Sequence, residues 1–193
     1  MNLDRGGFAG MLKLGVVLAL YAAVACVGLA FVYAGTKDII TQRQQEDQAR
    51  ALLELFPDAD SFEAVQGIRS GDPMVVFEEG GAFQVLRHGQ TVGLAISTSR
   101  AAYGGAIKTL VGVGMDNRIS GVKILEHSET PGLGANAAKP AFYGQFAGMA
   151  AGAPFVPKQD VAAITAATIT SQAVSSSVKA AAEAASAWLG GSR

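Results

Sequence analysis

A long uncharged run near the N-terminus constrains the fold of this chain most. No residue between positions 14 and 36 carries a charge. At about 1.5 Å per residue, a helix of that length spans roughly the 30 Å hydrocarbon core of a bilayer. Tyr33 stands near one end of the run, where an aromatic side chain is expected to anchor at the interface. We therefore predict that residues 1–36 form a short cytoplasmic tail and a transmembrane anchor embedded in the lipid bilayer.

The same run could instead be a cleaved signal peptide, with Ala23-Val24-Ala25 as its small-residue cleavage site. Strong apolarity continues past this point to Tyr33, which favours a retained single-pass anchor. Basic residues stand on both sides of the run. A short N-terminal tail followed by a folded domain favours an N-inside orientation. We expect the domain on the outer, periplasmic side of the inner (cytoplasmic) membrane.

Composition limits what the rest of the chain can do. The 193 residues leave room for one globular domain after the anchor. The formal net charge of -1 gives no basic footprint, so we expect no nucleic-acid partner. One cysteine and two histidines are too few for a zinc site or an iron–sulfur cluster held by this chain alone, and we predict no metal site. Redox chemistry would need an organic cofactor or a partner.

A second helix is predicted directly after the anchor. Residues 37–56 contain no Gly or Pro, begin with polar side chains and become amphipathic at Ala49, Leu52, Leu53 and Phe56. Pro57 should end this juxtamembrane helix. Residues 57–193 then form the domain proper.

Alternating patterns predict an antiparallel sheet in that domain. Residues 82–86 and 91–98 read as strands joined by a turn at His88-Gly89. Residues 107–115 and 118–125 read as a hairpin that turns at Asp116-Asn117. Strict alternation would place four residues of the second strand of this hairpin on one face, namely Ile119, Gly121, Lys123 and Leu125.

Helices and a long loop complete the predicted α+β fold. Residues 127–160 are rich in Gly and Pro, and a stretch this long with little regular structure is uncommon unless it serves a site. One short helix is expected within it, with packing aromatic side chains at Phe142, Tyr143 and Phe146. A final helix over residues 169–189 should dock on the domain through a face made of Val174, Val178, Ala181, Ala185 and Trp188.

Three separated stretches stand out in the domain. They are Ala102-Tyr103-Gly104-Gly105-Ala106-Ile107, then Glu126-His127-Ser128-Glu129-Thr130-Pro131-Gly132-Leu133-Gly134, then Ile164-Thr165-Ala166-Ala167-Thr168-Ile169-Thr170-Ser171. Taken singly, they have simple structural readings: a strand entry, a turn and a helix cap. The third stretch could also hold a phosphate, because a helix N-terminus offers free N–H groups and a positive dipole end.

In this order, behind an apolar anchor, the three stretches resemble the FMN-binding domain of the G subunit of the Rnf-type ion-translocating electron-transport complex. The related C subunit of the Na+-translocating NADH:quinone reductase shares these motifs. The resemblance covers nearly the whole chain, and the Glu-Thr-Pro-Gly-Leu-Gly string is its most specific part. It implies a single transmembrane helix followed by one FMN-binding domain.

The resemblance also implies a covalent cofactor. In that family a separate flavin transferase attaches FMN through its phosphate to the last threonine of a Ser/Thr-Gly-Ala-Thr motif, which here is Thr168. Such a chain is a phosphothreonyl flavoprotein, and in that sense a phosphoprotein. Two positions depart from the family pattern. Ala166 stands where the family has Gly, and Ala162 stands where it usually has an acid. Ala166 would be tolerated if its backbone is not left-handed.

The other candidate cofactor-binding residues come from the same stretches. We expect Thr170 and Ser171 to donate hydrogen bonds to the phosphate. Glu129 or Thr130 should bond an edge of the flavin ring, and Leu133 should offer an apolar face. The remaining expected members of the site are Thr165, Ala167, Gly134, Tyr103 and Gly104. No residue is expected to be catalytic, because no acid/base pair or nucleophile triad is recognisable.

The function implied by the resemblance is electron transfer within a membrane-bound, ion-translocating ferredoxin:NAD+ oxidoreductase. The chain would have no independent activity and would relay electrons between the other membrane subunits of the complex. The changes at Ala162 and Ala166 leave an alternative open. The chain could be a non-redox assembly or binding subunit of the same kind of complex, with a lost or non-covalent flavin site. A free-standing FMN enzyme is the third possibility.

Overall fold

The computed structural model describes residues 5–191 of the chain, and side chains from residue 10 onward. The chain divides into two compact units, residues 1–46 and 47–193. Residues 1–4 of the predicted tail lie outside the described residues. Helix α1 (Arg5–Leu55) contains the apolar run and is long and apolar enough to cross a membrane. It has no break at residue 36, where the sequence analysis separated anchor and juxtamembrane helix.

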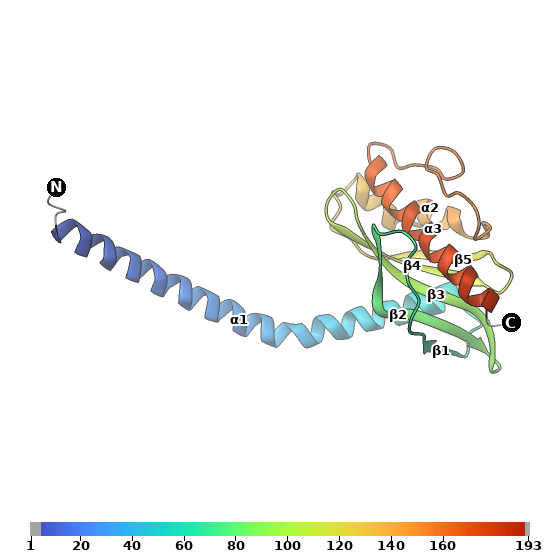
Figure 1. Ribbon diagram of the computed structural model, residues 1–193, viewed down its shortest axis with the longest axis horizontal. Coiled ribbons are helices and arrows are strands. Elements are labelled where there is room, and N and C mark those ends of the chain that lie inside the picture. The colour runs from blue at the N-terminus through green and yellow to red at the C-terminus, as the bar shows by residue number, and fades with distance from the viewer. Residues whose placement is uncertain (1–4, 192–193) are drawn as a thin grey trace. The chain divides into compact units, whose positions relative to one another are not determined.

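The second unit is built around a five-stranded antiparallel sheet in the simple order β1-β2-β3-β4-β5 (Figure 1). The strands are β1 (Ser61–Ala64), β2 (Val75–Arg87), β3 (Gln90–Ala101), β4 (Ala106–Gly114) and β5 (Ile119–Glu126). The predicted hairpins are confirmed, with His88 and Asn117 in the left-handed conformation that tight turns require. Strand β1 was not predicted.

One face assignment within the sheet was wrong. Ile119 joins Val122 and Ile124 in the core beneath α3, whereas Leu125 packs on the opposite face. The register between β4 and β5 shifts between the pairs Gly112–Gly121 and Val113–Ile119. One extra residue in a strand reverses which face the following side chains occupy. Strict alternation therefore fails at this bulge.

Helix α3 (Thr168–Gly191) covers one face of the sheet, over β3 and β4 (Figure 1). Its predicted docking face is confirmed: Val174, Val178, Ala181 and Ala185 are fully buried, and Trp188 packs against the same core. Between β5 and α3 lie η1 (Gly134–Ala138), α2 (Pro140–Tyr143) and η2 (Gly144–Phe146). Phe142 and Phe146 pack within the core, as predicted, and their rings meet edge to face.

The last turns of α1 cover the opposite face of the sheet. Ala51, Leu52, Leu55 and Phe56 are buried against β2, β3 and β4. Two of the expected positions were wrong, because Ala49 and Leu53 are exposed and the buried stripe is displaced around the helix. The helix ends at Leu55, because the residue before Pro57 disfavours helical backbone.

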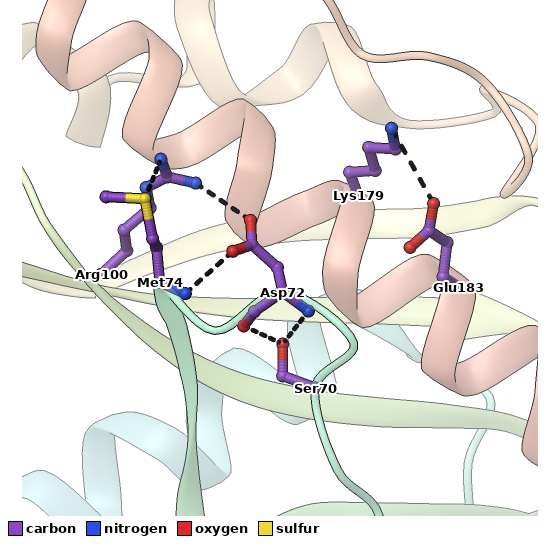
Figure 2. A network of polar contacts seen from close by, with 6 residues as sticks. All are labelled: Ser70, Asp72, Met74, Arg100, Lys179 and Glu183. Atoms are coloured by element: carbon purple, nitrogen blue, oxygen red, sulfur yellow. Dashed lines mark hydrogen bonds and ion pairs between the residues drawn. The ribbon is translucent and has the colours of Figure 1, made fainter.

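Three polar contacts join the sheet to the segments that pack around it. Lys123 of β5 donates to the Glu54 carboxylate of α1 and to the Tyr143 hydroxyl. The hydrogen bond to Glu54 is the main cause that raises the pKa of Lys123 above its ordinary value, so this amine stays charged well into alkaline pH. In the connection between β1 and β2, Asp72 pairs with Arg100 of β3 at 3.3 Å (Figure 2).

Candidate functional site

A cavity of about 410 Å³ lies where the three sequence motifs meet. This volume is in the range of small-molecule and cofactor sites. Eight of the predicted site residues line it together with Ala166 and Ile169: Tyr103, Glu129, Thr130, Leu133, Gly134, Ala167, Thr168 and Thr170. Residues more than 60 positions apart in the chain therefore share one concave surface.

The first turn of α3 forms one wall of the cavity. Thr168 is the first helical residue and is exposed. No described residue bonds its hydroxyl, and none accepts from the backbone N–H groups of Thr168, Ile169 and Thr170. Unpaired N–H groups at a helix N-terminus carry a partial positive charge. This wall thus combines a free hydroxyl with donors suited to an anion.

The neighbouring hydroxyls are bound inside the protein. Thr170 is fully buried and donates to Oε2 of Glu129 at 2.7 Å. The Ser171 hydroxyl is also buried, donates to the carbonyl of Ala167 at 2.9 Å and accepts from the N–H of Ile164 at 2.9 Å. Both hydroxyls expected to donate to a phosphate already hold the helix start in place. Ser171, Thr165 and Gly104 do not line the cavity.

The carboxylate of Glu129 connects all three motifs. The side chain is buried, with 7% of its residue surface exposed. Oε1 accepts from the backbone N–H of Gly104 at 2.7 Å, while Oε2 accepts from Thr170. A hydrogen bond to an ionised group is stronger than one between neutral groups. Glu129 was expected to face a flavin edge, and its two recorded bonds go instead to protein groups.

Two glycines allow this close arrangement. A Cβ atom at Gly134 would overlap Oε2 of Glu129 and lie 2.8 Å from the Thr170 hydroxyl. A Cβ atom at Gly104 would overlap the carbonyl oxygen of Ser128. Gly104 and Gly134 are therefore needed for packing between the motifs themselves.

The two positions that depart from the family pattern are both on the loop before α3. Ala166 has φ of 59°, so its backbone is left-handed. The condition under which Ala would be tolerated without strain is not met. At Ala162, the Gln145 side chain bonds the backbone on both sides, accepting from the N–H at 2.7 Å and donating to the carbonyl at 3.3 Å. Asp160, the nearest carboxylate, accepts from the N–H of Val156 in its own loop.

Two residues of the cavity, Ala166 and Ile169, are not among the predicted cofactor-binding residues. Ile169 is 55% exposed although it is large and apolar, and Tyr103 and Leu133 are likewise exposed. An apolar residue directly after Thr168, facing away from the core stripe of α3, was the signal that could have found it. The three side chains give the cavity an apolar rim beside its polar wall.

Comparisons with known proteins agree with this geometry. Residues 102–183 match the FMN-binding domain family, and residues 1–55 match the RnfG N-terminal region. The chain is 36% identical over 168 residues to the G subunit of the ion-translocating oxidoreductase complex of Methanosarcina acetivorans, covering 84% of this chain and 87% of the relative. It is 34% identical over 179 residues to the G subunit of the proton-translocating ferredoxin:NAD(+) oxidoreductase complex of Clostridium ljungdahlii, covering 90% and 91%.

The chain belongs to the family of G subunits of ion-translocating oxidoreductase complexes. Among solved structures, it is similar to the C subunit of the Na(+)-translocating NADH-quinone reductase from Parabacteroides distasonis. That similarity has a TM-score of 0.47 and 24% identity, and covers 56% of this chain and 61% of the other.

As a member of the G-subunit family, the chain is an electron-transport component with an FMN-binding domain and one membrane-spanning helix. The cavity fits such a cofactor in its chemistry. The free N–H groups at the start of α3 suit a phosphate, and the apolar rim suits an aromatic ring system. The N-terminal match includes the apolar run, so this run is a regular part of the family's chains.

Proposed function

We propose that this chain carries FMN covalently on Thr168 and relays electrons between the other membrane subunits of a ferredoxin:NAD+ oxidoreductase complex. The Clostridium ljungdahlii relative is named for that reaction. The bound flavin supplies the electron-transfer chemistry, and the protein supplies binding, position and electrostatics. The chain itself needs no substrate site beyond the cavity.

The observation that carries this proposal is the state of the Thr168 hydroxyl. Within the third motif, the hydroxyls of Thr170 and Ser171 are buried and bonded, and Thr165 lies outside the cavity. Thr168 is exposed at the cavity wall, and no described residue bonds its hydroxyl. An acceptor for covalent modification must be free and reachable, and Thr168 meets both conditions.

Attachment would be a phosphoryl transfer without any change of oxidation state. The Thr168 oxygen forms a bond to the phosphorus of the FMN unit, and the pyrophosphate bond of a flavin dinucleotide donor breaks. The mononucleotide leaving group departs with the electron pair, and the hydroxyl proton passes to a base or to water. A separate flavin transferase would bind the donor. The N–H groups of Ile169 and Thr170 would then hold the ester phosphate.

Other residues of the cavity would hold the ring system. Tyr103, Leu133 and Ile169 offer apolar surface, and Thr130, which lines the same cavity, would offer a polar contact. Gly134, which also lines the cavity, lets the backbone approach the Glu129 carboxylate closely. A tether to Thr168 would keep the cofactor in place in a compartment without free flavin, so its potential could be set independently of binding affinity.

For the whole chain we propose the arrangement expected from the sequence: a cytoplasmic tail and anchor (1–36), a juxtamembrane helix (37–56) and the flavin domain (57–193) on the outer side of the membrane. The partners are the other subunits and, during maturation, the flavin transferase. Small residues of the anchor permit close contact with partner helices, namely Gly15, Ala19, Ala22, Ala23 and Gly28.

Intact mass measurement tests this function. The full-length chain is expressed with and without an active flavin transferase, and its peptides are mapped. We expect a mass increase of one FMN, located on Thr168 and abolished in Thr168→Ala. Ser176→Ala, which removes a hydroxyl from the same helix outside the cavity, should be modified like the wild type. No increase, or attachment at Thr165, would contradict the proposal and favour the alternative of a non-redox assembly role.

A further inference from the structure

We propose that Glu129 is a positioning residue for flavin attachment, acting through Thr170 to fix the first turn of α3 and present Thr168 to the cavity. This inference rests on the proposed function, because it concerns how the acceptor hydroxyl is held. It gives Glu129 a role distinct from contact with the cofactor. The residues that make the connection are Glu129, Gly104, Gly134 and Thr170, which we call the carboxylate clasp.

Within the carboxylate clasp, Glu129 bonds groups from the two other motifs. Oε1 of Glu129 accepts from the Gly104 N–H, and Oε2 accepts from the Thr170 hydroxyl, each at 2.7 Å. No lysine, arginine or histidine in the described chain forms an ion pair with this buried carboxylate. The two hydrogen bonds are therefore the interactions with described residues that offset the cost of burying the Glu129 carboxylate. Losing either one would leave a buried charge less well satisfied, which is costly.

The space around the clasp admits little variation. Because a Cβ atom at Gly134 would overlap Oε2, the carboxylate occupies the volume that any side chain at this position would need. The same Cβ atom would crowd the Thr170 hydroxyl. Gly134 thus keeps open the place where the second and third motifs meet, and the carboxylate fills that place.

The first turn of α3 needs such a fastening. Its N–H groups at Thr168, Ile169 and Thr170 have no acceptor among the described residues, and the preceding Ala166 is left-handed. A helix start of this kind frays unless side chains hold it. Ser171 ties the turn to its own loop, whereas Thr170 ties it to a distant part of the domain. Thr170 stands two residues after Thr168 in the same turn, so its fixed position also holds the backbone that carries Thr168 at the cavity wall.

The test compares initial rates of flavin attachment in full-length variants, using purified transferase and limiting enzyme. Thr170→Val removes the donor and keeps the side-chain shape, and we expect a rate lower by on the order of tenfold, as for the loss of a bond to a charged group. Thr170→Ser keeps the hydroxyl and should restore the rate. Backbone amide exchange in residues 168–171 of the unmodified chain should be faster in Thr170→Val only.

Two controls separate positioning from general stability. Thr109→Val makes the same change at a buried hydroxyl that has no hydrogen-bond partner among the described residues, and should leave the rate unchanged. Val178→Ala creates a cavity further along α3 and lowers stability without touching the clasp. Measured where all variants are folded, it should also be modified at the wild-type rate.

The outcomes are distinct. If the wild type is modified and Thr170→Val is modified equally fast with unchanged exchange, the clasp has no positioning role and this inference is wrong. The same conclusion follows if Val178→Ala slows attachment as much as Thr170→Val. If the wild type itself takes up no flavin, the proposed function is wrong and this inference falls with it.

Discussion

Ala166 occupies a backbone conformation that its side chain makes unfavourable. Its φ of 59° lies in the left-handed region, where a Cβ atom approaches the following carbonyl oxygen at a cost of roughly 1–2 kcal/mol. Hydrogen bonds of the surrounding loop and helix start hold it there. They are the two bonds of the Ser171 hydroxyl, the backbone bond from Ala167 to Ile164, the bonds between Gln145 and the Ala162 backbone, and the carboxylate clasp. The resemblance described above implies Gly at this position, and a glycine would adopt the same conformation without strain.

We predict that Ala166→Gly is neutral to stabilising, by up to about 1 kcal/mol. The glycine relieves strain in the folded chain, although it also increases the entropy of the unfolded chain. Urea unfolding of the detergent-solubilised chain measures the difference. If strain in this loop limits the rate of flavin attachment, Ala166→Gly should also be modified faster than the wild type.

Ala163→Gly is the matched control for this change. Ala163 lies in the same loop, and its φ is not positive. Glycine there should cost about 0.5–1 kcal/mol, because it adds entropy to the unfolded chain and relieves nothing. Equal destabilisation by both substitutions would show that Ala166 is not strained.

At the scale of elements, the end of α1 packs against three glycines on neighbouring strands. Cβ atoms at Gly93 and Gly112 would lie 2.8 Å and 2.7 Å from the ring of Phe56, and one at Gly121 would lie 3.3 Å from Leu55. Gly112 and Gly121 are direct partners across β4 and β5. Because these three positions have no side chains, they leave a shallow depression in the sheet, here called the bed. Leu55 and Phe56 pack into it.

We predict that Gly112→Ala destabilises the domain by about 1–3 kcal/mol, since the added methyl group overfills this bed and displaces Phe56. Gly144→Ala is the control, because Gly144 has helical φ and ψ of -65° and -21° and no atom within 4 Å of the added Cβ. That change should be neutral or slightly stabilising. Unfolding of both variants in urea distinguishes the two cases, and a harmless Gly112→Ala would contradict the packing role of the bed.

The sequence predicted the elements better than the contacts between them. Turn residues and alternation located the hairpins of β2–β3 and β4–β5, and the Val174–Val178–Ala181–Ala185 spacing located the buried face of α3. Such signals are local. The bulge that turns Ile119 to the other face, the left-handed Ala166 and the inward Glu129 depend on tertiary neighbours. Spacing in the chain does not encode these neighbours.

The candidate site follows the same division. Residue types and order were sufficient to bring eight predicted residues to one cavity, because each motif ends or begins a regular element. Which hydroxyl is free could not be read from Thr165, Thr168, Thr170 and Ser171 in a row, since all four have the same chemistry. Only the positions of their partners distinguish Thr168 from Thr170.

At the scale of the whole molecule, the side of the membrane that holds the domain decides where flavin attachment can occur. Arg5 and Lys13 precede the uncharged run, while Lys37, Arg43 and Arg50 follow it, so basic residues alone do not decide the orientation. The domain after the run is long, and long domains cross the membrane largely regardless of their charge. The basic residues near the run therefore do not prevent the domain from lying on the outer side, which is the arrangement we propose.

We predict that Gln159→Cys, in a Cys26→Ala background, reacts with a membrane-impermeant maleimide in intact spheroplasts. Cys26 is the single native cysteine and lies within the apolar run, so its removal leaves one reporter thiol per chain. Gln159 is exposed on the loop before α3, which makes the introduced thiol accessible. Asn2→Cys in the same background is the control for the opposite side and should react only after permeabilisation. The reverse pattern would place the domain in the cytoplasm, where free flavin is abundant. A shortage of free flavin would then no longer explain why the cofactor is tethered to Thr168.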